Sequence, residues 1–377
     1  TNIPPHNLGE LCEGLIHLVD NPKATSEDLM EFVKGPDFPT GGIIYGKKDI
    51  TAAYATGRGG IVLRAKTDIE EVKGKHRIVV TEVPYQVNKA TLLEKIAKLV
   101  QEKKLVGIKD LRDESNKHGV RVVVDLKKDA YPRKILNQLF KMTDLQKTFH
   151  VNMIALVDGI QPRLLTLKAV LEEHIKHRQE VIRRRTQFDL DKANDRAHIL
   201  EGLKKALDQI DAVINTIRKS KDKEDAKANL MKKFKFTERQ TVAILDMRLQ
   251  QLANLEHQKI IDELKQILAL IKELESILKS EKKILGLIKK ETQAILDAHA
   301  DDRRTKINAQ GVKDFSVEDL IPNEPTIIMA TRDGYIKRMP VDTFKKQARG
   351  GKGVIGVTTK EEDVVEHLRS TNTHDNL

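Results

Sequence analysis

The chain has 377 residues, of which 33% are charged, only 4% are aromatic and none is Trp. Single cores stop growing at roughly 250 to 300 residues, so this length excludes one compact domain, and the charged composition favours long solvated helices. Lys and Arg outnumber Asp and Glu by 67 to 56, which gives a net charge of +11 and indicates a polyanionic partner, with nucleic acid favoured over an anionic membrane.

Cysteine usage and hydropathy exclude further classes of protein. Cys12 is the only cysteine, so the chain forms no internal disulfide and no thiolate metal site, and a reducing, cytoplasmic setting fits best. No apolar run approaches the roughly 18 to 20 residues that span a bilayer, and the N-terminus does not look like a signal peptide. The sequence therefore predicts a protein with no membrane segment. The chain begins with Thr1 rather than Met, and we expect both ends to be cuts in a longer protein.

Strand and helix patterns alternate over residues 41–161, with Gly and Pro between them. Apolar residues at helical spacing predict a helix over residues 89–103, and a Pro in the first turn opens a second helix over residues 132–142. Short β-branched runs predict strands at residues 61–63, 77–80 and 120–124. We therefore predict a mixed α+β domain in this part of the chain.

Two long helices are predicted after this domain. Apolar residues step by three and four, first at Leu200, Leu203, Leu207, Ile210, Ile214 and Ile217, and later at Ile260, Leu264, Ile267, Ile271, Leu274 and Leu278. Each helix has one apolar stripe that it cannot bury alone, so we expect the two to fold back on each other as an antiparallel arm. Periodicity alone also permits a parallel homodimeric coiled coil or a plain helical bundle.

A small helical knob is expected between the two long helices. Thr237-Glu238-Arg239-Gln240 has the form of a capping box and predicts a short helix through Leu249. The apolar residues of this segment exceed what so short a helix needs to bury, so we assign part of their surface to contact with a second copy of the chain. These residues are Ile244, Leu245, Met247, Leu249 and Leu252. The alternative is that they pack on the arm.

A β domain is predicted after Arg303, where the helical pattern ends. Pro322 and Pro325 interrupt the chain, and β-type runs at residues 326–330 and 335–338 flank Thr331-Arg332-Asp333-Gly334. An Asp-Gly pair between two such runs is typical of a hairpin. The remaining chain is too short to complete the core of this domain.

Seven motif regions occur in order along the chain. The first five are Thr1-Asn2-Ile3-Pro4-Pro5-His6-Asn7-Leu8, Pro36-Asp37-Phe38-Pro39-Thr40-Gly41-Gly42, Tyr54-Ala55-Thr56-Gly57-Arg58-Gly59, Pro84-Tyr85-Gln86-Val87-Asn88-Lys89 and Leu111-Arg112-Asp113-Glu114-Ser115. The sixth consists of His177-Arg178, Arg183-Arg184-Arg185-Thr186 and His198-Ile199-Leu200-Glu201-Gly202-Leu203. The seventh runs from Ile244-Leu245-Asp246-Met247-Arg248-Leu249 through Leu255-Glu256. This order resembles the A subunit of bacterial DNA gyrase, a type IIA DNA topoisomerase. The resemblance implies an α+β fold with a tower domain, a long antiparallel coiled-coil arm, an exit-gate knob and the start of a β-pinwheel domain.

The resemblance also assigns boundaries to these parts. Residues 1–35 would be the tail of a winged-helix cleavage domain, and residues 36–160 would be the tower. The outgoing helix, the exit-gate knob, the returning helix and the DNA-wrapping β domain would occupy residues 161–220, 221–254, 255–304 and 305–377.

Gln347-Ala348-Arg349-Gly350-Gly351-Lys352-Gly353 resembles the gyrase box, whose usual form is Q-R-R-G-G-K-G. Arg349 and Lys352 supply positive charge, and the three glycines let the backbone approach a phosphate and point N–H groups at it. Ala348 departs from the usual Arg, which removes one expected phosphate contact. The box favours gyrase over the related A-type subunit of topoisomerase IV, and the ordered motifs disfavour a nonenzymatic DNA-binding coiled-coil scaffold. As an isolated motif, the same loop would be an ordinary Gly-rich link between strands.

Basic residues of the tower are the other predicted DNA contacts. Arg58, Arg64 and Lys66 are expected to bind the DNA backbone, together with Lys73, Lys75 and Arg77 on one shared sheet face. Gly57-Arg58-Gly59-Gly60 resembles a phosphate cradle, although a tight turn before the strand explains its glycines equally well.

The resemblance places the DNA-cutting tyrosine upstream of Thr1, so we expect no catalytic residue among Tyr45, Tyr54, Tyr85, Tyr131 and Tyr335. We expect no metal site either. His174 and His177 lack a third ligand, and Asp189 and Asp191 lie on a charged helix surface.

The resemblance further implies the partners and the reaction. The chain would bind duplex DNA, form a homodimer through the exit gate and join the gyrase B subunit in an A2B2 complex. It would bind no cofactor itself, because Mg²⁺ and ATP belong to the B subunit. The complete enzyme would carry out ATP-dependent negative supercoiling by double-strand passage in the cytoplasm.

Overall fold

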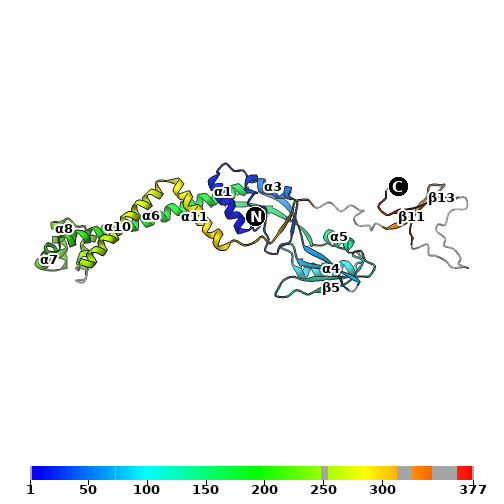
Figure 1. The fold of residues 1–377 in the computed structure, drawn as a ribbon, viewed down its shortest axis with the longest axis horizontal. Helices are drawn as coiled ribbons and strands as arrows, with labels where there is room; N and C mark the ends of the chain where they lie inside the picture. The colour runs from blue at the N-terminus through cyan, green and yellow to red at the C-terminus, as the bar shows by residue number, and fades with distance from the viewer. Residues whose placement is uncertain (1, 73, 248–253, 312–323, 342–362, 376–377) are drawn as a thin grey trace. The chain divides into compact units, whose positions relative to one another are not determined.

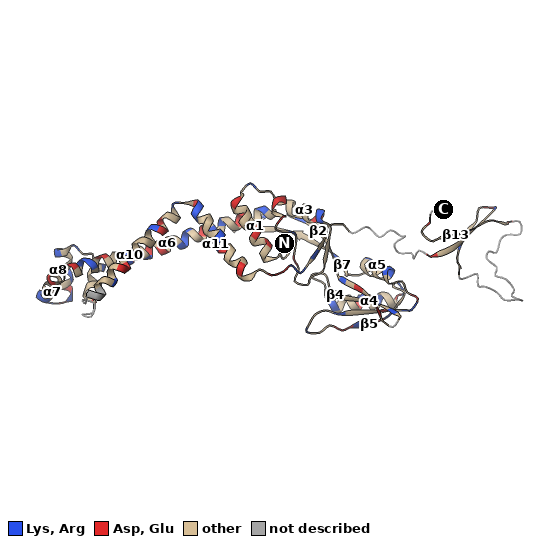
Figure 2. Ribbon diagram, viewed as in Figure 1, with Lys and Arg blue, Asp and Glu red and all other residues tan. Residues whose placement is uncertain are grey.

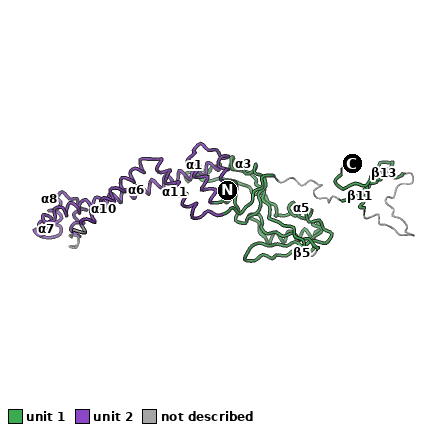
Figure 3. The backbone as a smooth tube through the Cα atoms, viewed as in Figure 1, with its two compact units in different colours: residues 1–7, 34–166, 302–377 green, residues 8–33, 167–301 purple. Residues whose placement is uncertain are grey.

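The computed structural model describes residues 2–72, 74–247, 254–311, 324–341 and 363–375 (Figure 1). The backbone forms two compact units, each built from separate stretches of sequence (Figure 3). The first comprises residues 1–7, 34–166 and 302–377, and the second comprises residues 8–33 and 167–301. Among the described residues no helix is both long enough and apolar enough to span a bilayer.

A four-stranded sheet, the β2 sheet, lies in the first unit with strand order β10-β1-β2-β7. Its strands are β10 (Lys306–Asn308), β1 (Ile43–Tyr45), β2 (Arg58–Arg64) and β7 (Gln146–Asn152). β1 pairs parallel with β10 and antiparallel with β2, which pairs antiparallel with β7. β10 was expected in the C-terminal β domain. Its backbone instead satisfies the hydrogen bonds of β1, so the boundary expected at residue 305 is corrected to a later position.

Helix α3 (Lys47–Thr56) packs on one face of the β2 sheet, where Ile61 and Leu63 are buried. Gly57 ends this helix with a φ of 78°, a conformation that favours glycine. A Cβ atom at Gly59 would lie 2.8 Å from the Cβ of Ala53, so only glycine lets helix and strand approach this closely. The interpretation as a tight turn before the strand is therefore confirmed for Gly57, whereas Gly59 and Gly60 lie within β2 itself.

A second four-stranded sheet, the β4 sheet, has the order β3-β4-β6-β5. Its strands are β3 (Lys66–Val72), β4 (Lys75–Glu82), β6 (Val122–Leu126) and β5 (Ile108–Asp113). One face forms a core with α4 (Lys89–Gln101) and α5 (Pro132–Met142), in which Ile78, Val124 and Leu139 are fully buried. The mixed α+β domain and both of its helices are confirmed, although α4 ends two residues before the predicted limit.

A two-stranded hairpin pairs β8 (Ile154–Val157) with β9 (Gln161–Leu164). The outgoing helix was expected to begin at residue 161, but it begins at Leu167. Pro162 lies within β9, and a helix rarely starts before such a residue because proline disfavours helical backbone in the residue that precedes it.

The C-terminal sheet has the order β12-β11-β13 and is antiparallel throughout. Its strands are β12 (Ile336–Pro340), β11 (Pro325–Thr331) and β13 (Val365–Asn372). Gly334 has a φ of 88° in the turn between β11 and β12, as the Asp-Gly pair predicts. The predicted hairpin is confirmed.

Two antiparallel helical segments dominate the second unit (Figure 1). Helix α6 (Leu167–Asp208) packs against α10 (Asn254–Leu278) and α11 (Glu281–His299). Leu200 clusters with Leu264, Leu190 with Leu274, and Ile182 with Ile284. Residue numbers fall along one partner as they rise along the other, so the predicted antiparallel pairing within one chain is confirmed for these residues.

The N-terminal helices α1 (Leu8–Asp20) and α2 (Ser26–Leu29) belong to the same unit. Val19 packs against Ile182 and Ile284, and Lys289 forms an ion pair with Asp20 at 2.7 Å. Residues 1–35 were expected to form one part of the molecule, the end of a cleavage domain. The structure divides them, because α1 and α2 pack against α6, and α1 also packs against α11, whereas residues 1–7 and 34–35 belong to the first unit.

The knob consists of α7 (Ile210–Lys219), α8 (Lys223–Phe234) and α9 (Glu238–Leu245). Gln209, with φ −129° and ψ 37°, separates α7 from α6. Val213 and Ile217 therefore pack in the knob core, and the expected continuation of the long-helix seam through Ile217 is wrong. Thr237 forms both hydrogen bonds of the predicted capping box.

Candidate nucleic-acid interface

One face of the β2 sheet is polar, and we call it the outer face. Side chains alternate along a strand, and residues opposite each other in paired strands share a face. Pairing places twelve residues on it, namely Ile43, Tyr45, Arg58, Gly60, Val62, Arg64, Gln146, Thr148, His150, Asn152, Lys306 and Asn308. None of these residues is buried, whereas Ile61, Leu63 and Phe149 on the opposite face are.

The outer face carries three cationic side chains, Arg58, Arg64 and Lys306, and no Asp or Glu among its twelve residues. Arg58 and Lys306 are exposed, and neither forms an ion pair with any carboxylate in the described ranges. Such a face gains electrostatic free energy from a polyanion, because it has no carboxylate of its own to satisfy these charges.

The outer face also offers hydrogen-bonding groups besides its arginines and lysine. Thr148 and His150 are exposed there. Asn2 pairs its backbone with Asn152, with N···O distances of 2.9 and 3.0 Å, and its side-chain Nδ2 donates to the backbone carbonyl of His150 at 2.6 Å. Guanidinium, imidazole and hydroxyl groups therefore lie on one surface, and these are groups that bind DNA phosphates.

Arg64 lies on the same face but is held within the protein. Its guanidinium lies 4.9 Å from the ring centroid of Tyr45 and 4.7 Å from that of Phe140, and its Nε donates to Oε1 of Gln146 at 2.7 Å. Partial burial lowers the pKa of Arg64. The expectation that Arg64 is displayed to DNA is corrected, because stacking on two rings occupies its cationic surface.

Lys66 lies on the β4 sheet, where its Nζ is 3.3 Å from Oε1 of Glu82. Glu82 also accepts a hydrogen bond from the backbone N–H of Gly42 at 2.6 Å. The expected single face for residues 58–77 is wrong, because β2 belongs to one sheet and β3 and β4 belong to another. Lys73 lies outside the described residues.

On the solvent-facing side of the β4 sheet, arginines form ion pairs with nearby carboxylates. Arg77 pairs with Glu70, and Arg121 pairs with Glu114 at 3.1 Å. Arg112 contacts three carboxylates at 2.5 to 3.3 Å, and its hydrogen bond to Asp125 contributes most to the raised pKa of its guanidinium. The ion pairs of this network are Arg77–Glu70, Arg121–Glu70, Arg121–Glu114, Arg112–Asp110, Arg112–Glu114 and Arg112–Asp125.

Asp113, in the same Leu-Arg-Asp-Glu-Ser motif, links the end of β5 to the start of α4. Its carboxylate lies 2.7 Å from Nζ of Lys89 and accepts a hydrogen bond from the backbone N–H of Ser115 at 3.0 Å. The hydrogen bond from Lys89 and those from Ser115 lower the pKa of Asp113 to about 2. The motif therefore has a structural role within the domain.

The residues expected at a dimer contact fall into three groups. Ile244 is 4% exposed in the knob core, so it packs within its own chain and the expectation for this residue is corrected. Leu245 and Met247 pack against the same core but stay partly exposed, and their contact with a second copy stays a prediction. Leu249 and Leu252 lie outside the described residues.

The gyrase-box residues Gln347, Arg349, Gly350, Gly351, Lys352 and Gly353 also lie outside the described residues. Tyr45 packs against Arg64, and two further tyrosines have aromatic or histidine partners. Tyr54 is fully buried with its hydroxyl 2.6 Å from Nε2 of His6, and the ring of Tyr85 stacks on that of Phe38 at 5.0 Å. Packing within the domain therefore accounts for both of these rings.

Acidic and histidine side chains do not gather into a metal site in the part of the chain that the structure describes. Burial, and then the charges of Arg178 and His177, lower the pKa of His174. His174 and His177 thus lie beside Arg178, whose positive charge disfavours a metal cation at this place.

Sequence reasoning missed Lys306 and His150. The alternation of exposed and buried residues along residues 146–152 is a signal for His150, since Phe149 and Val151 alternate with it. Lys306 has no such signal, because it reaches the outer face through a parallel pairing of β10 with the distant strand β1.

Comparison with known proteins agrees with this architecture. A family model described as that of the DNA gyrase/topoisomerase IV A subunit matches residues 1–293, and a model described as DNA gyrase C-terminal domain, beta-propeller matches residues 325–372. Because the first match covers well over half of the chain, the chain belongs to the family of DNA gyrase and topoisomerase IV A subunits.

Within this family, the curated relatives point to DNA gyrase. The chain is 54% identical to the DNA gyrase A subunit of Clostridium acetobutylicum and 52% identical to those of Staphylococcus epidermidis and Staphylococcus aureus. Each match covers 100% of this chain but only 42 to 45% of the relative. The chain therefore spans less than half the length of these relatives, and the resemblance to part of a gyrase A subunit is confirmed.

Proposed function

We propose that this chain is the part of a DNA gyrase A subunit that binds and guides duplex DNA and forms the exit gate. The complete enzyme would carry out ATP-dependent negative supercoiling by double-strand passage. The observation that carries the DNA-binding proposal is the outer face of the β2 sheet, which exposes Arg58 and Lys306 and contains no carboxylate among its twelve residues. Phosphate contacts of this kind position a duplex without reading its sequence.

The exit-gate proposal rests on the antiparallel helices and the knob at their end. A knob that meets its symmetry mate would close a gap between two pairs of helices, and the partly exposed Leu245 and Met247 would supply apolar contact surface. The assembly we propose is a homodimer joined to the gyrase B subunit in an A2B2 complex in the cytoplasm. Mg²⁺ and ATP would be bound by the B subunit, whereas this chain would bind no cofactor.

The second candidate is the A-type subunit of topoisomerase IV, which shares the first family model. The match of residues 325–372 to the gyrase C-terminal model favours gyrase. A scaffold that only holds DNA is disfavoured, because it does not explain identity to gyrase proteins along the whole chain. Replacing Arg349 and Lys352 with Ala in the complete enzyme distinguishes these candidates. We expect weaker DNA wrapping and supercoiling with unchanged cleavage, and full supercoiling would contradict gyrase-type wrapping by the box.

Experiments on the purified chain test whether it dimerises and binds DNA without cutting it. We expect it to dimerise in analytical ultracentrifugation and to bind duplex DNA with a steep dependence on salt. We expect neither cleavage nor relaxation of plasmid DNA, because the proposed nucleophile lies outside this sequence. A covalent protein–DNA adduct formed by the purified chain would refute the noncatalytic assignment.

A further inference from the structure

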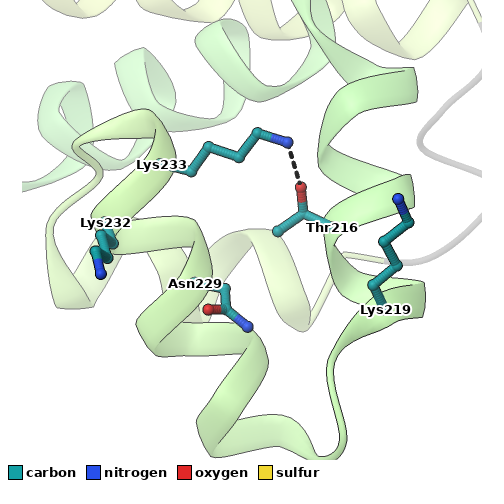
Figure 4. Close-up of a pocket in the computed structure, with 5 residues that line it drawn as sticks. All are labelled: Thr216, Lys219, Asn229, Lys232 and Lys233. Atoms are coloured by element: carbon teal, nitrogen blue, oxygen red, sulfur yellow. Dashed lines mark hydrogen bonds between the residues drawn. The ribbon is translucent and has the colours of Figure 1, made fainter.

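An open pocket of about 450 Å³ lies between α7 and α8 of the knob (Figure 4). We call it the knob pocket. Thr216 and Lys219 line it from α7, and Asn229, Lys232 and Lys233 line it from α8. Lys233 extends towards α7, and its Nζ donates to Oγ1 of Thr216 at 3.1 Å (Figure 4). Three lysines, a threonine and an asparagine thus line one cavity.

The acidic residues nearest in sequence to the pocket do not line it. Residues 216–235 contain eight Lys or Arg but three Asp or Glu, namely Asp222, Glu224 and Asp225. Asp222 accepts a hydrogen bond from the backbone N–H of Asp225 at 2.8 Å, and Asp225 accepts one from the backbone N–H of Lys221 at 2.9 Å. These acids therefore stabilise the first turn of α8, and none of them lines the knob pocket.

The three lysines of the pocket have no carboxylate partner among the described residues. Lys223 and Lys227, by contrast, pair with Asp246 at 3.0 Å and Glu238 at 2.7 Å in the same knob. Like charges that border one cavity repel each other, so an anion that enters the cavity is stabilised by all of them.

Helix ends explain part of this arrangement but not all of it. Lys219 lies in the last turn of α7, and Lys232 and Lys233 lie in the last turn of α8, where cations interact favourably with the helix dipole. The dipole acts on each helix separately. It does not require the lysines of two helices to border the same cavity with Thr216 and Asn229.

We propose that the knob pocket binds a backbone phosphate of duplex DNA. The proposal rests on the function proposed above, in which a duplex passes the knob. Lysine is a point charge that accepts any phosphate geometry, so contact at this place would be independent of base sequence. The amide of Asn229, whose Nδ2 donates to Oγ of Ser220 at 3.1 Å, lies within the same lining and offers a further donor hydrogen.

Lysine acetylation of the full chain, followed by mass spectrometry, tests the proposal. A mixed-sequence duplex at low salt is expected to protect Lys219, Lys232 and Lys233 several-fold more than the other lysines of the knob. The reference lysines are Lys221, Lys223 and Lys235. Equal protection of both sets, or protection of neither while the chain binds the duplex, would overturn the pocket assignment.

A parallel experiment with inorganic phosphate distinguishes the source of the anion. We expect the duplex to protect the pocket lysines at phosphate-group concentrations far below those at which inorganic phosphate does. Protection by inorganic phosphate alone, with no protection by the duplex, would overturn the assignment to DNA.

Matched variants give a second measurement. K219Q/K232Q/K233Q removes the three pocket charges, and K221Q/K223Q/K235Q removes three charges from the same knob outside the pocket. The slope of log affinity against log salt is negative, and the pocket variant is expected to reduce its magnitude by at least about 0.9, the change for one phosphate contact. The control variant is expected to reduce it by less. If the two variants had equal salt slopes, the pocket assignment would be contradicted but the proposed function would not. Failure of the wild-type chain to bind any duplex would instead contradict the function proposed above.

Discussion

The two four-stranded sheets of the first unit carry similar numbers of basic residues but use them in different ways. On the outer face of the β2 sheet, Arg58 and Lys306 are exposed and no carboxylate is present among its twelve residues. On the solvent-facing side of the β4 sheet, Arg77, Arg112 and Arg121 are each paired with a carboxylate. The difference shows that two basic segments of one chain can differ in whether their charges are already neutralised, and only the exposed, unneutralised cations are candidates for a DNA contact. The distribution of acidic residues decides this. Figure 2 shows where Lys and Arg (blue) and Asp and Glu (red) occur along the ribbon.

Arg64 tests the comparison most strongly, because it is the cation of the β2 sheet that the protein uses for its own packing. Arg64→Ala should lower the free energy of unfolding by about 2 kcal/mol, from the loss of two cation–π contacts and of side-chain packing. Chemical denaturation measures this change. Arg58→Ala, on the same strand and face, is the control and should change it by less than about 0.5 kcal/mol. Equal destabilisation by the two variants would contradict the different roles.

Removal of the two exposed cations should have the next largest effect. R58A/K306A is expected to weaken duplex binding by about tenfold at moderate salt. The magnitude of the slope of log affinity against log salt should fall by about 1.8, because two phosphate contacts are lost. Fluorescence anisotropy over a salt series measures both. Wild-type affinity in this variant would show that the outer face does not bind DNA.

Arg112→Ala tests whether the arginines of the β4 sheet stabilise the fold rather than bind DNA. Loss of this arginine leaves Asp110, Glu114 and Asp125 close together without their shared partner, so the melting temperature should fall, and added salt should reduce the loss. Duplex affinity should change by less than about twofold, since the network is internally neutralised. A large loss of DNA binding with an unchanged melting temperature would reverse the roles assigned to the two sheets.

The smallest effect should be a dependence of stability on pH at Asp113. Its pKa is lowered from 3.8 to about 2, so the folded state favours the ionised carboxylate. The contribution to stability is complete above the unfolded pKa near 3.8 and is lost as the pH falls through about 2. Wild type should therefore exceed Asp113→Asn in stability at about pH 5, and the difference should shrink as the pH falls to about 2. Urea denaturation at several pH values measures the difference, and a constant difference would show that Lys89 does not hold the ionised form.

Much of the local structure was predictable from the sequence. The periodicity of Leu200 and Leu264 predicted the two long helices, Pro132 and the Asp333-Gly334 pair marked a helix start and a turn, and Thr237 marked a cap. These signals are local, because they depend on side-chain spacing of about 3.6 or 2 residues and on the backbone preferences of Pro and Gly. The family resemblance was also readable, because short motifs kept their order.

The site was less predictable, because it depends on pairing between distant segments. Arg58 and Arg64 lie at the two ends of one strand, yet only the aromatic rings of Tyr45 and Phe140 decide that Arg64 is withdrawn from the surface. Lys306 joins the face only through the parallel pairing of β10 with β1. In the knob, the interruption at Gln209 moved Ile217 from the expected helix seam into another core.

The sequence by itself determined which segments are helix and strand, where several of them begin and end, and to which family the chain is related. Only the tertiary structure decided which cations stay exposed, which are neutralised and which apolar residues remain for a partner. Helical and strand periodicity arise from neighbouring residues in the chain. The free energy of a charge or an apolar side chain depends instead on groups that folding brings to it from distant positions.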